Sequence, residues 1–480
     1  MSMTPVTAVF DIGKTNKKFL LFDLDYRVVF KQQTELELIE DDDGDPCENW
    51  VDLEQWMQRK LKQARSNEDF EIKALNFSGY GATLVHLGEN GRPAAPIYDY
   101  LKEYPSDLLG RFYQQYGGKE HFSVVTASPP MGMLNSGLQL YWLKHKKPDM
   151  FDRIAHTLHF PQYLAHIFSG SLHSELTSVG CHTGLWNFRE DRYHHWVREE
   201  GIDPLFPSMQ PVTTSEKQDD GMRIGIGIHD SSAALAPYLV GMDDPFMLVS
   251  TGTWSITFNP FNPEPLTFGE LKRDCLSYIN IYGEPVKASR VFLGREFSHQ
   301  KKKLDRHFNS HNAGYEMEPD PELLEKLVRN ANPEKKLELE QAHGSGPYPS
   351  DEPGHWDPGI FGSYTEAYHQ LMLDLASIQA DCITLVEGEE PVNQMVVTGG
   401  FSQNTLFNRL LASLLPGKDI YSASLPHASA LGAAMVVNGQ ESFVNEQQKE
   451  LLTLTRHQPL PVNGIKGYRW RQPGINGSTE

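Results

Sequence analysis

Short apolar runs alternate with polar turns at the start of the chain. Residues 7–10 and 19–22 are apolar, and the polar segment 11–18 (DIGKTNKK) between them holds one glycine, which predicts strand, turn and strand. The alternation continues through residues 28–30 and 34–38. We therefore expect a meander of antiparallel strands in this region.

The next segments predict a helix and a further strand. Residues 50–65 carry leucine, tryptophan and methionine at spacings of three and four, which indicates a helix with one buried face. Residues 72–77 are apolar again and predict a strand that ends at residues 78–81 (SGYG).

The opening pattern returns in the middle of the chain. Residues 246–249 are apolar, the turn 250–255 (STGTWS) holds one glycine, and residues 256–258 are apolar again. Two hairpins can share a turn composition by chance. A chain of 480 residues, however, exceeds what one hydrophobic core usually covers, so a second domain is expected, and this hairpin begins where that domain should start. The sequence therefore predicts a degenerate internal repeat, with domains over residues 1–240 and 241–480.

After residue 343 the sequence predicts a loop, a long helix, a strand and a second helix. A Gly- and Pro-rich loop over residues 344–363 is followed by one long helix over residues 364–388. A strand over residues 394–400 and an amphipathic helix over residues 404–415 come next. The polar tail beyond Gly464 is expected to be peripheral.

Charge and cysteine content narrow the class of function. Asp and Glu number 63 against 43 Lys and Arg, and the net charge of -20 repels phosphate backbones, so nucleic acid is not an expected partner. The four cysteines form no C-x-x-C pair and the chain starts without a basic and apolar leader, so we expect reduced thiols and a cytoplasmic location. No apolar run reaches the roughly 18 residues of a membrane span, so no membrane association is expected.

The turns 11–18 and 250–255 are candidates for phosphate binding. Each offers backbone amides and hydroxyl groups beside a glycine that lets a ligand approach closely. One such turn is more often an ordinary hairpin, but one in each half suggests a nucleotide held between two related domains. The P-loop and dinucleotide-binding signatures are both missing from the sequence, so those two folds lose their main support.

Asp230 follows a glycine-interrupted apolar strand over residues 221–229 and precedes the helical pattern of residues 231–240. One role for such a residue is structural, because Asp is a preferred N-cap before an apolar helix. The other role is chemical, because a carboxylate at the end of a strand can act as a general base toward an attacking hydroxyl. The two roles are compatible, since a helix N-terminus keeps a carboxylate ionised.

Two further segments combine glycine with helix signals. Gly399 and Gly400 stand between an apolar strand and a helix, where a nucleotide could lie against the backbone or where glycine serves only a tight turn. Residues 427–437 (HASALGAAMVV) place small side chains on a helix, which suits close packing against either a neighbouring helix or a ligand. The sequence leaves both pairs of alternatives open.

Taken in order, the motifs DIGKTNKK, SGYG, GIHDSSAALAPY, STGTWS, TGGFSQN and ALGAA resemble those of the FGGY carbohydrate kinases of the actin, hexokinase and Hsp70 superfamily. The resemblance runs from about Val6 to Val437, nearly the whole chain. It implies an α/β fold of two ribonuclease-H-like domains with a cleft between them. It also implies that the first domain binds the sugar and the second binds ATP, with Mg²⁺.

The resemblance implies roles for particular residues. Asp230 matches the catalytic base, and Asp11 would lie near the magnesium ion. The residues implied in ATP or phosphate binding are Gly13, Lys14, Thr15, Asn16, Thr251, Gly252, Thr253, Gly399, Gly400 and Asn404. Polar groups at strand ends that face a cleft can bind sugar hydroxyls, which makes candidates of Ser78, Tyr80, Thr83, Asp99 and His229.

Two departures from the family pattern bear on the substrate. Residues 80–83 resemble the corresponding stretch of rhamnulose kinases more than that of many other family members, but they lack its acidic residue. Residues 426–429 (PHAS) stand where the family often has an acidic residue. The expected reaction is ATP-dependent phosphorylation of a ketose such as L-rhamnulose or L-fuculose. The alternatives are a kinase for another polyol or a sugar acid, and a non-catalytic actin-like ATP-binding protein. The sequence leaves the oligomeric state open, a homodimer included.

Overall fold

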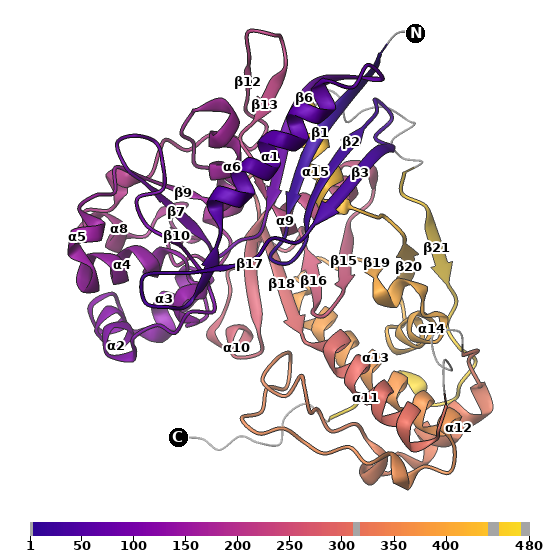
Figure 1. Ribbon diagram of the computed structural model, residues 1–480. Helices are drawn as coiled ribbons and strands as arrows, with labels where there is room; N and C mark the ends of the chain where they lie inside the picture. The colour runs from indigo at the N-terminus through magenta and orange to yellow at the C-terminus, as the bar shows by residue number, and fades with distance from the viewer. Residues whose placement is uncertain (1–2, 311–316, 440–450, 472–480) are drawn as a thin grey trace.

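Two seven-stranded sheets organise the chain, one in each half (Figure 1). The computed structural model describes residues 3–310, 317–439 and 451–471. The N-terminal sheet has the strand order β12-β13-β6-β1-β2-β3, with β14 also paired to β6. The C-terminal sheet has the order β17-β18-β16-β15-β19-β20-β21.

The strands of the N-terminal sheet are β1 (Thr4–Ile12), β2 (Lys17–Phe22), β3 (Val28–Thr34), β6 (Phe70–Gly79), β12 (Ser215–Lys217), β13 (Arg223–Gly225) and β14 (Ile228–His229). Those of the C-terminal sheet are β15 (Phe246–Thr251), β16 (Ser255–Asn259), β17 (Cys275–Ile279), β18 (Pro285–Val291), β19 (Gln394–Gly399), β20 (Asp419–Ala423) and β21 (Leu454–His457). Smaller sheets contain β4 (Ile39–Glu40), β5 (Pro46–Glu48), β7 (Leu84–Leu87), β8 (Ile97–Tyr98), β9 (His156–His159), β10 (Trp186–Asn187) and β11 (Arg192–Tyr193).

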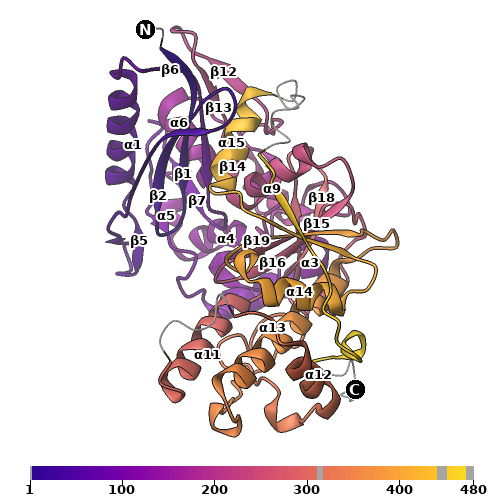
Figure 2. The same cartoon turned by 90° about the vertical axis from the view of Figure 1, so that its right-hand side faces the viewer.

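Helices surround both sheets, as the two perpendicular views show (Figures 1 and 2). Those of the first half are α1 (Trp50–Arg65), α2 (Ser106–Gln115), α3 (Lys119–Val125), α4 (Gly137–Lys146), α5 (Pro148–Phe151), α6 (Phe160–Ser169), α7 (Leu176–Val179), α8 (His195–Glu199) and α9 (Asp230–Gly241). Those of the second half are α10 (Phe268–Leu271), α11 (Leu293–His307), α12 (Pro321–Asn330), α13 (Tyr364–Val386), α14 (Thr405–Leu414) and α15 (Ala428–Asn438). Short 3₁₀ turns include η1 (Gly132–Leu134) and η5 (Gly400–Gln403).

The two main sheets are built in the same way. β1 pairs antiparallel with β2 and parallel with β6, and β15 pairs antiparallel with β16 and parallel with β19. Because each half repeats one pattern of hairpin and parallel neighbour, the predicted internal repeat and the mixed α/β class are confirmed. The boundary between residues 240 and 241 stays a prediction.

Local signals explain why several elements match the sequence prediction. Helix α1 covers the predicted residues, because the Asn49 side chain caps it by accepting from the Asp52 amide and because Leu53, Met57 and their neighbours at helical spacing are buried. The predicted strands over residues 7–10, 19–22, 28–30 and 72–77 lie inside β1, β2, β3 and β6. The long helix is confirmed as α13, with Ser363 as its cap.

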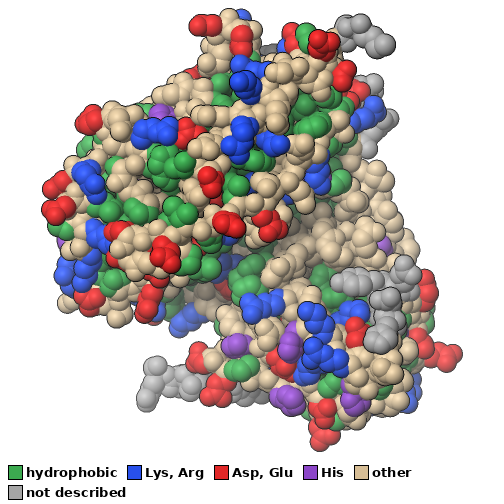
Figure 3. Space-filling view, viewed as in Figure 1, with side chains coloured by type: hydrophobic (Ala, Val, Ile, Leu, Met, Phe, Trp, Pro, Cys, Tyr) green, Lys and Arg blue, Asp and Glu red, His purple; other side chains and the backbone are tan. Residues whose placement is uncertain are grey.

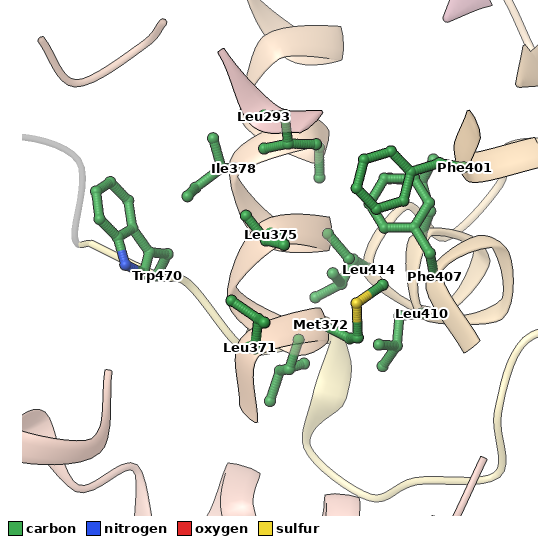
Figure 4. Close-up of a cluster of buried hydrophobic side chains, with 14 of the residues drawn as sticks. Leu293, Leu371, Met372, Leu375, Ile378, Phe401, Phe407, Leu410, Leu414 and Trp470 are labelled. Atoms are coloured by element: carbon green, nitrogen blue, oxygen red, sulfur yellow. The ribbon is translucent and has the colours of Figure 1, made fainter. Parts of the chain in front are cut away.

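Two predictions about element ends are wrong. The strand expected over residues 34–38 ends at Thr34, because Thr34 pairs with Lys17 and the partner strand β2 begins there. The tail beyond Gly464 is not peripheral over its described part, which ends at Arg471, because Tyr468 and Trp470 are buried against the C-terminal core. Figure 4 shows the Trp470 ring beside α13, and its indole nitrogen donates to the Leu337 carbonyl.

Helices α9 and α15 join the two halves. α15 comes from the second half but packs on the N-terminal sheet, where the Asn76 side chain donates to the Ala433 carbonyl and Arg223 donates to the Val437 carbonyl. A Cβ atom at Gly432 would lie 1.8 Å from the Ala233 carbonyl oxygen, so glycine lets α15 approach the backbone of α9. The small residues of α15 therefore serve helix packing, one of the two alternatives left open by the sequence.

Candidate active site

Strand ends of the N-terminal sheet bring four predicted site residues to one edge. In the register of the sheet Asp11 lies opposite Ser78, and His229 lies opposite Gly79. Asp230 follows directly as the first residue of α9. Parallel strands end at the same edge of a sheet, so segments far apart in sequence meet here.

The Asp230 carboxylate has two polar neighbours. The Ser231 hydroxyl donates to its Oδ1 at 3.2 Å, and His229 Nε2 lies 3.3 Å from the same oxygen. The N-cap of α9 is His229, so the interpretation of Asp230 as the cap is wrong. Burial, and next the negative charge of Asp11, raise the pKa of Asp230 to about 7.

The histidine beside Asp230 is neutral at physiological pH. Burial lowers the pKa of His229 to about 4, and its Nε2 also lies 3.2 Å from the Cys181 sulfur. A neutral imidazole adds no positive charge beside Asp230, so it does not hold the pKa of that carboxyl down.

Asp11 is buried at the end of β1 and has a partner on each carboxylate oxygen. Lys18 Nζ donates to Oδ2 at 3.0 Å, and the Ser429 hydroxyl, from the first turn of α15, donates to Oδ1 at 3.0 Å. Magnesium is typically held by one or two carboxylates together with substrate phosphates, and Lys18 is partly exposed and can move aside. The residues present fit a magnesium ion bound through Asp11.

The turn 13–16 is closed by its own backbone. The Gly13 amide donates to the Asn16 carbonyl, and the buried Lys17 ammonium donates to the carbonyls of Gly13 and Lys14. Thr15 is exposed at this turn, as is Asn16. The Lys14 side chain does not reach toward the second turn but pairs with Asp99 at 2.8 Å.

The second turn divides into a structural and an exposed part. The Thr251 hydroxyl is buried, donates to the Thr398 carbonyl and accepts from the Phe401 amide, so it ties β15 to η5. Gly252 and Thr253 are exposed. Asn404 is buried as the cap of α14, accepting from the Phe407 amide and donating to the Tyr368 hydroxyl.

Two cavities border the turn between β19 and η5. The first, of about 510 Å³, runs from the first turns of α9 and α15 to the end of β19, and among its lining residues are Asp230, Ser231, Ser429, Thr398 and Gly399. The second, of about 520 Å³, runs from the second glycine turn to α11, and among its lining residues are Gly252, Thr253, Gly400, Arg295 and Lys302. Helix N-termini favour anions, so the first cavity suits phosphate at the end where α9 and α15 begin. The space-filling view shows the surface hollowed between the upper part of the molecule and the lower part that carries α11 to α13 (Figure 3).

The predicted sugar contacts differ in their surroundings. His229 touches it, while Tyr80 and Asp99 belong to a cluster with Lys14. Ser78 and Thr83 are fully buried, and within the described parts of the chain their hydroxyls have no hydrogen-bond partner. Of these candidates His229 contacts Asp230 directly, the hydroxyls of Ser78 and Thr83 lie beneath the surface, and a shared sugar site stays a prediction.

Some residues near the site were missed by sequence reasoning. The pKa of Tyr100 is raised first by burial, then by the negative charge of Asp99 and then by that of Asp230, so Tyr100 lies near the base. Trp254 stands in the second glycine turn, and the guanidinium of Arg290 lies 4.9 Å from its ring. Lys18 and Trp254 belong to the two turn motifs and could have been suspected there. Tyr100 and Arg290 carry no local signal.

We expect the Gly399→Ala variant to bind nucleotide about ten- to hundredfold more weakly, the equivalent of about 1–3 kcal/mol of overpacking. Gly399 has φ +79°, and a Cβ there would lie 1.8 Å from the Thr251 carbonyl oxygen, so the turn that separates the two cavities must move. Calorimetric titration with a magnesium–ATP analogue measures the effect. Gly417→Ala is the matched control, because Gly417 also has positive φ but no heavy atom within 4 Å of its Cβ position.

The pKa of Asp230 predicts a pH profile. A base with a pKa of about 7 is protonated below that pH, so kcat/KM for the acceptor should fall about tenfold per pH unit on the acid side and level off above about 8. The Ser231→Ala variant removes a hydrogen bond that lowers the pKa of Asp230, so its profile should move to higher pH. A profile that is flat from pH 5 to 8 in both proteins would contradict Asp230 as the titrating base.

None of the helices in the described ranges combines the length and apolar character needed to cross a membrane.

Comparison with known protein families matches both halves of the chain. The N-terminal domain of the FGGY family of carbohydrate kinases matches residues 6–217. The C-terminal domain described as carbohydrate kinase FGGY matches residues 243–446. A search of curated protein sequences gave no match.

Solved structures similar to this chain share its whole fold. A carbohydrate kinase from Novosphingobium aromaticivorans is 24% identical, with a TM-score of 0.79 over 96% of this chain and 98% of that one. A ligand-bound xylulose kinase from Lactobacillus acidophilus is 15% identical, with a TM-score of 0.75 over 97% and 95%. Plasmodium falciparum glycerol kinase with ADP is 14% identical, with a TM-score of 0.74 over 96% and 95%.

These likenesses confirm the expected architecture of two actin-like α/β domains. The two family domains together cover most of both halves of the chain. The chain therefore belongs to the FGGY family of carbohydrate kinases.

Proposed function

We propose that this sugar or polyol kinase transfers the γ-phosphoryl group of ATP to a hydroxyl of a ketose such as L-rhamnulose or L-fuculose, with Asp230 as the general base. The observation that carries the proposal is the Asp230 carboxylate, which has a pKa of about 7 and lines a cavity that extends to Gly399. A base with this pKa can accept a proton from a hydroxyl near neutral pH.

Phosphoryl transfer asks a protein mainly to align donor and acceptor and to neutralise charge. The turn residues Gly13, Thr15 and Asn16 would hold phosphate from one half of the chain, and Gly252 and Thr253 from the other. Gly399 and Gly400 would lie against the nucleotide at the junction of the two cavities. Thr251 and Asn404 would act indirectly, because their side chains already fix β15, η5 and α14.

A magnesium ion at Asp11 would supply positive charge to the phosphates during transfer. Lys18, which now pairs with Asp11, is a second source of positive charge at the same carboxylate. His229 and Ser231 contact Asp230 and would orient it, and Ser78, Tyr80 and Thr83 stay candidates for the part of the site that holds the sugar. The four buried free thiols support a reducing compartment such as the cytoplasm.

A coupled assay of ADP release tests the proposal. Wild-type protein with magnesium and ATP is presented with L-rhamnulose, L-fuculose, D-ribulose, D-xylulose, L-ribulose, glycerol and sugar acids. Stimulation by a ketose above all others supports the proposal. Stimulation only by glycerol or a sugar acid would show that the substrate is that compound and not a ketose. If the protein binds ATP but no compound stimulates ADP release, the proposed reaction with these acceptors is overturned.

A further inference from the structure

Lys14 and Asp99 form an ion pair at the turn that follows β1. Lys14 Nζ lies 2.8 Å from Asp99 Oδ2, and it lies 5.1 Å from the ring centre of Tyr100 and 5.6 Å from that of Tyr80. The Lys14 side chain is 24% exposed and Asp99 only 9%, so the ammonium is the more accessible partner. The pair therefore lies where a ligand can touch the lysine and rest against the aromatic rings.

Neighbouring contacts fix both members of the pair. The Lys14 carbonyl accepts from the buried Lys17 ammonium, which pairs with Glu48 at 2.9 Å. Asp99 Oδ1 accepts from the Leu101 amide at 2.9 Å, which leaves Oδ2 for the lysine. The turn that carries Lys14 is thus held so that the side chain points to Asp99.

Tyr100 connects this pair to the base. Its ring lies under the Lys14 ammonium, and the charges of both Asp99 and Asp230 contribute, after burial, to its raised pKa. The register of the sheet agrees with this, because Ile12, two residues before Lys14, and His229, one residue before Asp230, both lie opposite Gly79.

The basic groups around Asp230 are matched by acids. Lys18 pairs with Asp11, Lys17 with Glu48 and Arg290 with Asp274, at 3.0, 2.9 and 2.8 Å. Burial keeps the neighbouring histidines neutral, with the pKa of His229 at about 4 and that of His182 at about 3. Among these described side chains no positive charge is left over for a carboxylate of the substrate.

We propose that Lys14 and Asp99 together form a pair of zero net charge that binds adjacent sugar hydroxyls. The pair makes this enzyme select uncharged polyhydroxy substrates and discriminate against sugar acids. The ammonium donates to one hydroxyl oxygen while the carboxylate accepts from a neighbouring hydroxyl. Lys14 is then a specificity residue for the sugar and takes no part in holding phosphate. This inference rests on the proposed kinase reaction, and it replaces the expectation that Lys14 binds ATP.

The Lys14→Met variant separates the two roles of the lysine. We expect KM for the preferred sugar to rise about ten- to hundredfold, as for loss of a charge-assisted hydrogen bond, with KM for ATP unchanged. Lys73→Met is the matched control, because Lys73 is exposed, pairs with Glu71 and lies at the other end of the same sheet. An increase in KM for ATP, with KM for the sugar unchanged, would overturn the inference and leave the kinase reaction standing.

Direct binding makes the inference testable even without turnover. Calorimetric titration of wild type and Lys14→Met with a magnesium–ATP analogue should give the same affinity, and a tenfold loss in the variant would assign Lys14 to phosphate binding. Wild-type protein that binds the analogue but phosphorylates no acceptor would instead count against the proposed function.

The Asp99→Asn variant tests the substrate class. It leaves the Lys14 charge without its partner, so the ratio of kcat/KM for a sugar acid to that for the neutral sugar should rise at least about tenfold. Two outcomes would contradict a neutral pair. One is a wild-type enzyme that already prefers the sugar acid. The other is an Asp99→Asn variant that is folded by circular dichroism but whose ratio of kcat/KM values is unchanged.

Discussion

The Asp230→Asn variant should lose about 10²- to 10⁴-fold in kcat, the range expected for removal of a general base. Asparagine keeps the shape of the side chain and can still accept from the Ser231 hydroxyl, but it cannot take up the proton of the attacking hydroxyl. KM for ATP should change little, because the adenosine end of the nucleotide would lie along the second cavity, whose lining does not include Asp230. Steady-state kinetics of the coupled ADP assay provide the measurement.

Two controls accompany this variant. Ser231→Ala keeps the base but removes one of the groups that orient it, so its loss of kcat at pH 8 should be much smaller than that of Asp230→Asn. A thermal melt should show no loss of stability for Asp230→Asn, since the carboxylate does not cap α9 and its raised pKa means that folding disfavours its charged form. Near wild-type turnover in Asp230→Asn would assign the base to another group.

Replacing Lys17 by Met should lower the free energy of unfolding by about 3–5 kcal/mol, the usual effect of removing one member of a buried ion pair. Lys17 and Glu48 are 1% and 2% exposed, and Glu48 also accepts from the Tyr80 hydroxyl. The variant leaves the Glu48 charge buried without its cation. Chemical denaturation followed by tryptophan fluorescence measures the difference.

The double variant Lys17→Met/Glu48→Leu identifies the cause of this loss. If the unpaired carboxylate is responsible, removing it as well should restore much of the stability. Lys73→Met, in an exposed pair, should cost less than about 1 kcal/mol. A double variant no more stable than Lys17→Met would show that packing of the lysine stem, rather than the buried charge, determines the loss.

Local signals made much of the fold predictable. Helix α1 has a capping Asn49 and an apolar face, and the two hairpins at residues 11–18 and 250–255 each have apolar strands around a single glycine. The strand ends that carry Asp11 and Asp230 follow from the same patterns. These features depend on residues that are near one another in the chain.

Features that depend on distant partners were not predictable in this way. Nothing near Lys14 indicates that its partner is Asp99, and nothing near Asp11 indicates that Ser429 donates to it. The burial of Trp470 in a polar tail depends on a groove beside α13 that other segments build. The prediction that the tail is peripheral failed for that reason, and the residues beyond Arg471 lie outside the described range.

The contact between Gly432 of α15 and Ala233 of α9 constrains how the two halves can move. Backbone touches backbone there, so the helices cannot slide past each other without collision, and an opening that preserves the contact pivots about this point. Asp230 and Ser429 each stand three residues before the contact, roughly 4.5 Å along their helices. Because this pivot point lies so close to Asp230, such an opening moves the distant helix α11 by a large distance. Asp230, Ser429 and its partner Asp11 stay nearly stationary.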